Sequence, residues 1–427
     1  MITTYNKPTQ AQWSSLISRP QVATADLSKI VDNVFNDVLQ NGDAAIQQYT
    51  ANFDKVTIDN FQVSAKTIAE AANLVSDELK TAIATAKKNI ETFHTAQQTA
   101  IEYVETMPGV TCWRANSAIE NVGIYIPGGS APLFSTVLML GIPATIAGCK
   151  EIILCSPPDK EGNIHPAILY TAQLVGITKI FAVGGIQAIA GLCLGTTTLP
   201  KVDKIFGPGN QYVTAAKQKA LQYGVAIDMP AGPSEVLVIA DDTANANFVA
   251  ADLLSQAEHG ADSQVILLSN SNSLVNQTLA AIEKQLATLP RKAIAEQALK
   301  NSKVILLENI NDCIDFSNRY APEHLIIAVD NAENYISHII NAGSVFIGNY
   351  SCESMGDYAS GTNHTLPTNG YAKNYSGVSL DSFVKKITFQ KISKEGLQLL
   401  GPAVATMAAA EQLAAHKNAV TIRLNTL

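Results

Sequence analysis

The sequence holds seven histidines, and one of them stands at helical spacing from a glutamine. Gln256 and His259 are three residues apart at the predicted end of a helix, just before Gly260, so their side chains should share one face. Imidazole suits zinc, whereas a glutamine oxygen is a less usual ligand. The spacing therefore indicates a candidate metal site, with a helix-capping histidine as the alternative.

A second histidine follows an acid directly. Glu323 and His324 come just before the apolar run 325–327, which predicts a strand. An adjacent carboxylate and imidazole at a strand edge could exchange protons with a substrate. The alternative is an ordinary surface pair.

The other histidines lie in different contexts. Residues 348–377 are rich in Gly, Ser, Asn and Tyr and contain Asp357 and His364, which predicts either a functional loop or a turn-rich linker. His416 lies near the C-terminus. We expect His94 to be a solvated surface residue, and His165 and His338 to be structural.

Three glycine-rich turns follow predicted strands, at residues 126–130 (I-P-G-G-S), 183–187 (V-G-G-I-Q) and 207–210 (G-P-G-N). Such turns can present backbone N–H groups to phosphates. None of them fits the G-x-G-x-x-G fingerprint. All three should lie on one edge of a sheet, where ligands bind in folds of this kind.

The elements that must position these residues change in kind along the chain. Residues 27–50 and 64–95 have helical periodicity, whereas from residue 119 short β-branched runs alternate with helical stretches. The pattern predicts an α/β fold with two consecutive incomplete Rossmann-like units and parallel sheets. A long helix is expected over 397–416 and a short β-type end over 419–424. The expected domains are a helical N-terminal region (1–107), a first unit (108–232), a second unit (233–381) and a C-terminal element (382–427).

Composition excludes several classes of protein. The 427 residues are 47% hydrophobic and 15% charged, which suits large folded cores. The net charge of -8 argues against nucleic-acid binding. Residues 131–148 are too short and too interrupted to span a membrane. The N-terminus has no basic leader and the six cysteines show no C-x-x-C spacing, so we expect a cytoplasmic protein with reduced thiols.

Two longer stretches carry a family resemblance. Residues 227–236 (I-D-M-P-A-G-P-S-E-V) and 251–259 (A-D-L-L-S-Q-A-E-H) closely resemble the signature of histidinol dehydrogenases. Blocks at 123–129, 207–210, 321–324, 356–358 and 363–368 resemble the family in the same order, so the resemblance covers nearly the whole chain. It implies oxidation of L-histidinol to L-histidine through histidinaldehyde, with two NAD molecules, as the last step of histidine biosynthesis.

The resemblance also assigns residues. It implies zinc ligands that also contact substrate, namely Gln256, His259, Asp357 and His416. Further substrate contacts would be Ser234, His324, His364 and Glu411, and contacts to NAD would be Tyr125, Gln187 and Asn210. The family is an intertwined homodimer, so His416 would reach the partner's site. In this assignment His324 takes the hydroxyl proton and Glu323 activates the water that hydrates the aldehyde.

One position departs from the family, because Cys352 stands where proline is expected, five residues before Asp357. A thiol there could bind metal or oxidise, with a neutral packing change as the alternative. Two competing hypotheses remain. A thiolate, Cys149 or Cys155, could trap the aldehyde, although apolar surroundings should keep both inert. A protein that only binds metal or nucleotide is the other, and the Glu323–His324 pair argues against it.

Overall fold

The protein is described here by a computed structural model that covers residues 2–19, 25–128 and 132–427. Strands in these residues form two parallel sheets and one antiparallel sheet. Part of the glycine turn expected at 126–130 lies outside the described residues. Within the described ranges, no helix combines the length and the apolar character needed to cross a membrane.

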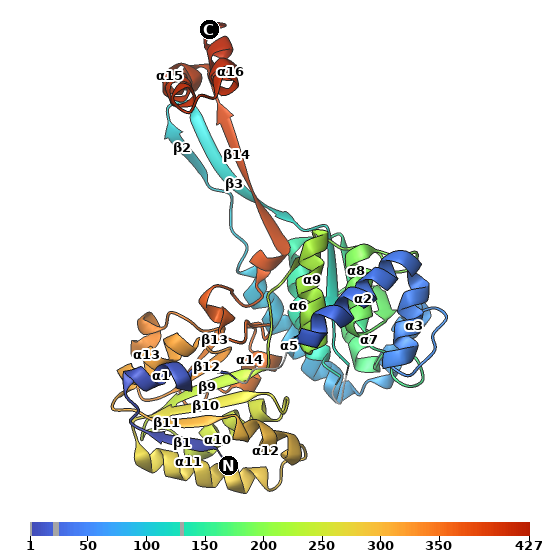
Figure 1. Ribbon diagram of the computed structural model, residues 1–427, viewed down its shortest axis with the longest axis vertical. Coiled ribbons are helices and arrows are strands. Elements are labelled where there is room, and N and C mark those ends of the chain that lie inside the picture. The colour runs from blue at the N-terminus through green and yellow to red at the C-terminus, as the bar shows by residue number, and fades with distance from the viewer. Residues whose placement is uncertain (1, 20–24, 129–131) are drawn as a thin grey trace.

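The first parallel sheet has five strands in the order β6-β5-β4-β7-β8. Helices cover both of its faces (Figure 1). The strands are β4 (Asn121–Tyr125), β5 (Glu151–Ser156), β6 (Lys179–Ala182), β7 (Lys204–Phe206) and β8 (Ala226–Ile227). Its own helices are α6 (Phe134–Ala147), α7 (Pro166–Leu174), α8 (Gly185–Leu194) and α9 (Gln211–Ala220). Helix α6 is apolar all round because it is buried, and it ends where Gly148 adopts a φ of 83°.

The N-terminal helices complete the layers of this sheet. Helix α5 (Asp77–Thr95) packs with α6 and α7 in one core, while α2 (Ala25–Asn41) packs with α8 and α9 in the other. The remaining short helices here are α3 (Asp43–Phe53) and α4 (Ala65–Glu70). The expectation that His94 is a surface residue is wrong, because its ring is buried at the end of α5 and Nδ1 donates to the carbonyl oxygen of Ile90 at 3.0 Å.

The second parallel sheet has six strands in the order β1-β11-β10-β9-β12-β13. They are β1 (Thr3–Asn6), β9 (Glu235–Ala240), β10 (Gln264–Ser269), β11 (Lys303–Leu306), β12 (His324–Ala328) and β13 (Ser344–Ile347). Helices α10 (Ala246–Ala257), α11 (Asn272–Leu286) and α12 (Lys292–Lys300) cover one face, whereas α1 (Gln10–Leu16) and α13 (Ile310–Tyr320) cover the other. Strand β1 is a finding that the sequence pattern did not predict. The segment with His338 forms a 3-10 helix, Ala332–His338.

The third sheet projects from the body as an arm (Figure 1). It pairs β14 (Val384–Ile392) and β2 (Tyr103–Met107) with opposite sides of β3 (Val110–Ala118), all antiparallel. Helices α15 (Lys394–Ala410) and α16 (Ala414–Leu424) form the tip. The expected β-type end at 419–424 is therefore wrong, because this segment packs as a helix against α15. The expected single helix over 397–416 is interrupted at residues 411–413.

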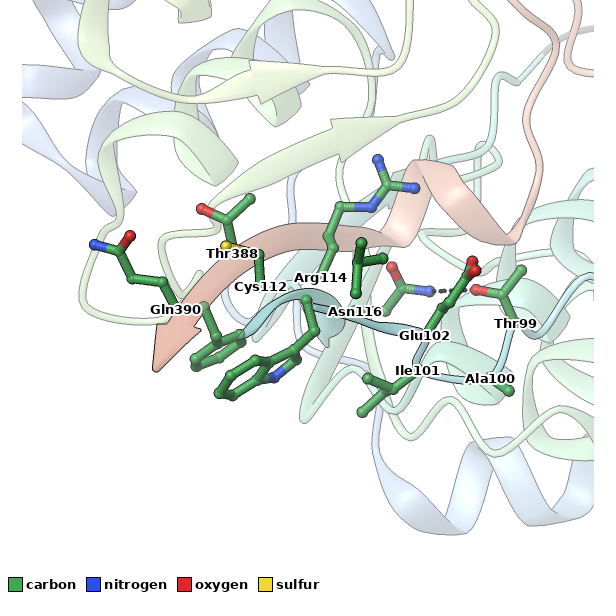
Figure 2. A pocket seen from close by; sticks show the side chains of 12 residues that line it. Thr99, Ala100, Ile101, Glu102, Cys112, Arg114, Asn116, Thr388 and Gln390 are labelled. Atoms are coloured by element: carbon green, nitrogen blue, oxygen red, sulfur yellow. Dashed lines mark hydrogen bonds between the residues drawn. The ribbon is translucent and has the colours of Figure 1, made fainter. Parts of the chain in front are cut away.

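An open groove of about 890 Å³ runs along the arm (Figure 2). Its walls are strands β3 and β14 together with residues 99–104. Trp113 and Phe389 stack there with ring centroids 5.4 Å apart, and Phe389 remains 41% exposed. The arm thus carries aromatic surface that its own chain does not cover.

Candidate active site and metal centre

The chemically active residues of the second unit gather at the amino-terminal edge of its sheet. Strands β9 and β12 are neighbours, with His324 opposite Val236, so Ser234 and Glu323 both lie just before the strands begin. Helix α10 runs back to the same edge and places Gln256 in its last turn. Helix α14 (Glu353–Tyr358) follows β13 and adds Asp357. The alternation of strands and helices therefore brings together Gln256 and Asp357, which are 101 positions apart in sequence.

The Glu323 carboxylate is held in a buried polar network. Its Oε2 accepts a hydrogen bond from the backbone N–H of Glu235 at 2.8 Å and lies 3.4 Å from Nε2 of Gln256. Burial raises the pKa of Glu323 to about 8, although the nearby His324 opposes the shift. A carboxyl group with a raised pKa can accept and return a proton near neutral pH.

The His324 ring is buried and its two nitrogens face different partners. Nδ1 lies 3.1 Å from the carbonyl oxygen of Glu235 and 3.3 Å from Nε2 of Gln256. Nε2 lies 3.3 Å from Oδ1 of Asp357. Burial by itself lowers the pKa of His324, but the carboxylates of Glu353, Glu323 and Asp357 outweigh it and raise the pKa well above its usual value.

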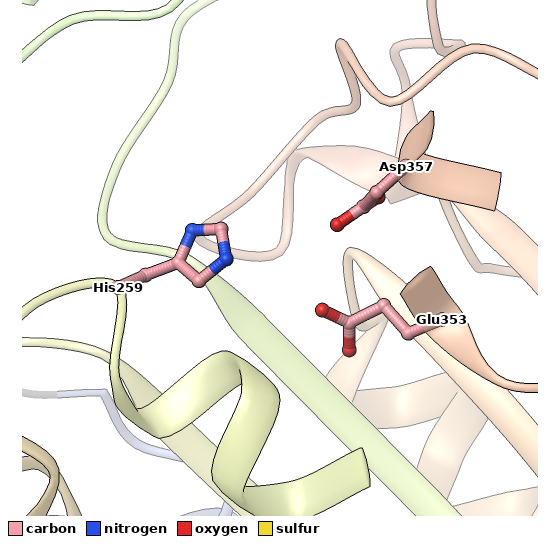
Figure 3. Close-up of side chains that lie close together, drawn as sticks. All are labelled: His259, Glu353 and Asp357. Atoms are coloured by element: carbon pink, nitrogen blue, oxygen red, sulfur yellow. The ribbon is translucent and has the colours of Figure 1, made fainter. Parts of the chain in front are cut away.

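Three side chains could hold a metal ion between α10 and α14. One ligand atom each from His259, Glu353 and Asp357 lies within 4.8 Å of the others (Figure 3). The neighbouring Gln256 directs Nε2 of its amide group toward the carbonyl oxygen of Glu235, at 3.2 Å. Oε1 of the same amide is buried and has no hydrogen-bond partner among the described residues. Nitrogen and oxygen donors with unsatisfied atoms fit a divalent cation such as zinc.

Charge distribution within this cluster follows from burial and neighbours. Burial lowers the pKa of His259, with the carboxylate of Asp357 opposing it. Burial raises the pKa of Asp357, but the hydrogen bond and charge of His324 outweigh it and hold the pKa below its usual value. Asp357 is therefore an anion, the form in which a carboxyl group binds a metal ion.

His364 connects this cluster to the first unit. Its Nδ1 donates to the backbone carbonyl of Asp357 at 2.8 Å, so its Nε2 accepts from the hydroxyl of Thr136 at 3.0 Å. Thr136 is in the first turn of α6, at the carboxyl edge of the first sheet. The amino edge of the second sheet therefore faces the carboxyl edge of the first. Thr136 was not predicted as a site residue.

The residues expected to contact NAD lie on that carboxyl edge. The Tyr125 hydroxyl, at the end of β4, accepts a hydrogen bond from Gly185 N–H at 3.1 Å. Gln187 is fully buried, with Nε2 3.3 Å from Asp54 Oδ2 and with Oε1 unpartnered among the described residues. Asn210 caps α9 by accepting from the backbone N–H groups of Tyr212 and Val213. Asp54, from the end of α3, is a neighbour that the sequence pattern did not reveal.

Two expected residues do not join the cluster within one chain. Glu411 follows α15 and His416 is in α16, and both are exposed at the tip of the arm. Figure 1 shows this tip well away from β12 and α14. Helices α15 and α16 chiefly contact each other and β14.

The cysteines fit a packing role better than a chemical one. Burial raises the pKa of the Cys149 thiol to about 11 and that of Cys155 further still. Cys352 is the N-cap residue of α14, and its side chain makes no capping hydrogen bond. It is not a member of the cluster formed by His259, Glu353 and Asp357.

Glu353 is the residue of this cluster that sequence reasoning missed. It precedes Asp357 by four residues, the spacing that places two side chains on one helical face. That spacing is a signal for it, but a helix of 6 residues is hard to recognise within a segment rich in Gly, Ser, Asn and Tyr. The structure forms α14 within it.

The chain is similar to known proteins of one family along nearly its whole length. A family model described as histidinol dehydrogenase matches residues 17–424. The histidinol dehydrogenase of Bacteroides thetaiotaomicron is 59% identical over 420 residues, covering 98% of each chain. That of Escherichia coli K12 is 53% identical over 429 residues, covering 100% of this chain and 98% of the relative. The crystal structure of the Elizabethkingia anophelis enzyme superposes with a TM-score of 0.98 at 62% identity, over 100% of this chain and 98% of that one.

Proposed function

The chain belongs to the histidinol dehydrogenase family, and on that premise we propose that Glu323 and His324 are the acid–base pair of its reaction. The activity is the NAD-linked oxidation of L-histidinol to L-histidine through histidinaldehyde, with two NAD molecules reduced in turn. The observation that carries the assignment is the buried Glu323–His324 pair, which stands beside three potential metal ligands.

The first oxidation requires a base for the hydroxyl proton. As the alcohol carbon gives its hydride to NAD, the hydroxyl proton passes to Nε2 of His324, which faces the cluster. His324 would be neutral and able to accept this proton once a bound cation offsets the carboxylates that raise its pKa. The aldehyde must then be hydrated, because only a gem-diol carries a second hydride on that carbon. Glu323 takes a proton from the attacking water, and its raised pKa suits this role. His324 returns its proton to the aldehyde oxygen as the water adds, and it takes a hydroxyl proton of the gem-diol as the second hydride goes to the second NAD.

We assign zinc to Gln256, His259 and Asp357, with the partner subunit's His416 as a further ligand. A zinc ion bound there would orient the imidazole and amine of the substrate and would neutralise nearby carboxylates. The orphaned Oε1 of Gln256 supports the assignment, since a buried carbonyl oxygen without a partner is costly. Ser234 and His364, which lie beside the cluster, would contact the substrate.

We place NAD against Tyr125, Gln187 and Asn210 at the carboxyl edge of the first sheet. The hydrogen bond between Thr136 and His364 brings that edge against the metal cluster, which supports a meeting of nicotinamide and substrate between the two sheets. The unpartnered Oε1 of Gln187 leaves an acceptor free for a ligand.

We further propose a homodimer in which each arm completes the partner's site with Glu411 and His416. Apolar side chains remain exposed along the arm, and exposed apolar surface of this extent marks protein contacts. They are Ile387, Phe389, Ile392, Leu399, Met407, Leu413 and Ile422. All six cysteines are free thiols, which suits the cytoplasmic location that we propose.

The function is tested with purified protein, histidinol, NAD and zinc. We expect about two NADH per histidinol, because both hydrides leave the same carbon. An unchanged NADH absorbance would favour a protein that only binds metal or nucleotide.

Two variants separate the roles within the site. His324→Ala should lose turnover and retain zinc, whereas His259→Ala should lose zinc and substrate affinity together. Full zinc occupancy in His259→Ala, measured by elemental analysis, would refute the ligand assignment.

A further inference from the structure

Glu353 is a buried carboxylate with an oxygen that nothing in the described part of the chain satisfies. Its side chain is 1% exposed, and Oε2 has no hydrogen-bond partner. It opens helix α14, one turn before Asp357. Figure 3 shows the two carboxylates on the same side of the cluster, facing the imidazole of His259. An unpaired carboxylate in this position costs free energy unless a cation accompanies it.

The groups around Glu353 are mostly acidic. The carboxylate of Asp357 faces it from α14, that of Glu323 from just before β12, and that of Asp252 from α10. Two imidazoles face it as well. The ring of His324 is already shared with Glu323 and Asp357, and burial lowers the pKa of His259, which disfavours its cationic form. The chemical class that would balance several carboxylates in a buried space is a divalent metal ion.

Of the metal ligands assigned above, Asp357 alone carries a negative charge, so one positive charge of a divalent ion would remain unbalanced. Gln256 and the two histidines are neutral donors. Adding the carboxylate of Glu353 would make the buried centre electrically neutral, which lowers the cost of burying it. A carboxylate on a flexible side chain can also withdraw when another donor arrives.

We propose that Glu353 is a direct ligand of the metal ion in the substrate-free enzyme and gives up that position to the substrate. The inference rests on the proposed metal site and adds a ligand to it. Glu353 thereby keeps a coordination position filled until a nitrogen of the substrate takes it. The driving observation is the convergence of His259, Glu353 and Asp357 within 4.8 Å.

The test replaces the native metal with cobalt, whose visible absorption reports coordination. Metal-free protein is titrated with Co²⁺, and affinity and spectrum are recorded with and without histidinol. Glu353→Gln should bind Co²⁺ about 10- to 100-fold more weakly and show a different substrate-free spectrum. With histidinol bound, the wild-type and Glu353→Gln spectra should converge, because the carboxylate has left.

Glu283→Gln is the matched control. Glu283 is exposed on α11, so this variant makes the same chemical change outside the cluster. It should leave Co²⁺ affinity and spectrum unchanged. If Glu353→Gln fails to fold, Glu353→Asp serves instead. It keeps the negative charge, but its shorter side chain moves the carboxylate oxygen away from the metal ion, so the substrate-free spectrum should change.

Different results separate this inference from the proposed function. Wild-type protein that takes up no Co²⁺ would overturn the metal site itself. If wild-type protein binds Co²⁺ and the Glu353 variants match it in affinity and in the substrate-free spectrum, Glu353 is not a ligand, and the site keeps its other assignments.

Discussion

Mixing two inactive variants tests the shared site. Glu323→Ala removes a group from the body of the molecule, and His416→Ala removes one from the tip of the arm. Strand β14 has 9 residues, so the arm carries α16 roughly 30 Å from the body at about 3.3 Å per residue. His416 therefore cannot reach Glu323 of its own chain while the arm keeps this conformation.

The expected activity follows from counting sites. In a mixed dimer, the His416→Ala chain keeps its own Glu323 and receives an intact His416 from its partner, so one of two sites is complete. Random reassociation of equal amounts yields roughly half mixed dimers, so about a quarter of all sites should be active. Each variant alone should be inactive.

The assay requires unfolding and refolding the mixture, or coexpression with two affinity tags, followed by measurement of NADH formation per dimer. The matched control mixes Glu323→Ala with His324→Ala. Both changes lie in the same body, so neither site of that mixed dimer is complete and no activity should return. Purified mixed dimers of the first pair that remain inactive would refute a site built from two subunits.

Three further predictions concern stability and the thiols. Burial raises the pKa of Asp54 to about 6 in the folded protein, so the folded protein favours the protonated carboxyl group. This stabilisation is fully present below the unfolded pKa of about 3.9 and is lost as pH rises through about 6. At pH 8 the free energy of unfolding of Asp54→Asn should therefore exceed that of wild type by about 1 kcal/mol, a value already reduced for the partial exposure of Asp54. Urea unfolding measures it, and the midpoints of the two proteins should converge as the pH falls toward about 4. Gly207→Ala should lower the free energy of unfolding by about 3 kcal/mol, because a Cβ would collide with the backbone oxygen at the end of β4 at a φ of 126°, while Gly224→Ala, in open space, should cost less. Replacing Cys149 and Cys155 with Ala should leave most aldehyde oxidation intact, and selective loss of that half-reaction would restore the thiol route.

The sequence predicted the parts of the fold whose signal is local. The strands of both parallel sheets read as continuous apolar runs because both faces are buried, and α6 is bounded by its own glycine. The prediction of a strand over residues 419–424 was wrong. Val420, Thr421 and Ile422 have high intrinsic strand propensity, but packing against α15 stabilises a helix there. Strand β14 was missed since its partner, β3, is distant in sequence and its own side chains are almost all exposed.

Prediction of the site had a similar limit. The Gln256–His259 spacing and the Glu323–His324 neighbours are visible locally, and the structure brings them to one sheet edge. Burial is not visible in the same way. His94 was misjudged because its environment depends on Asn363, whose Nδ2 lies 3.5 Å from the His94 ring across the fold.

The pairing of β3 with β14 also affects how the protein is made. The ribosome releases β3 well before β14, since 266 positions separate Ala118 from Val384. A two-stranded hairpin of β2 and β3 is marginal in water, so the arm must wait for its third strand. Both α/β bodies can fold during synthesis, whereas the tip that carries His416 forms last. A chain cut short by its final 44 residues would retain the Glu323–His324 pair but lack β14 and both tip helices. In the proposed dimer, catalysis would thus begin only after translation has reached its end.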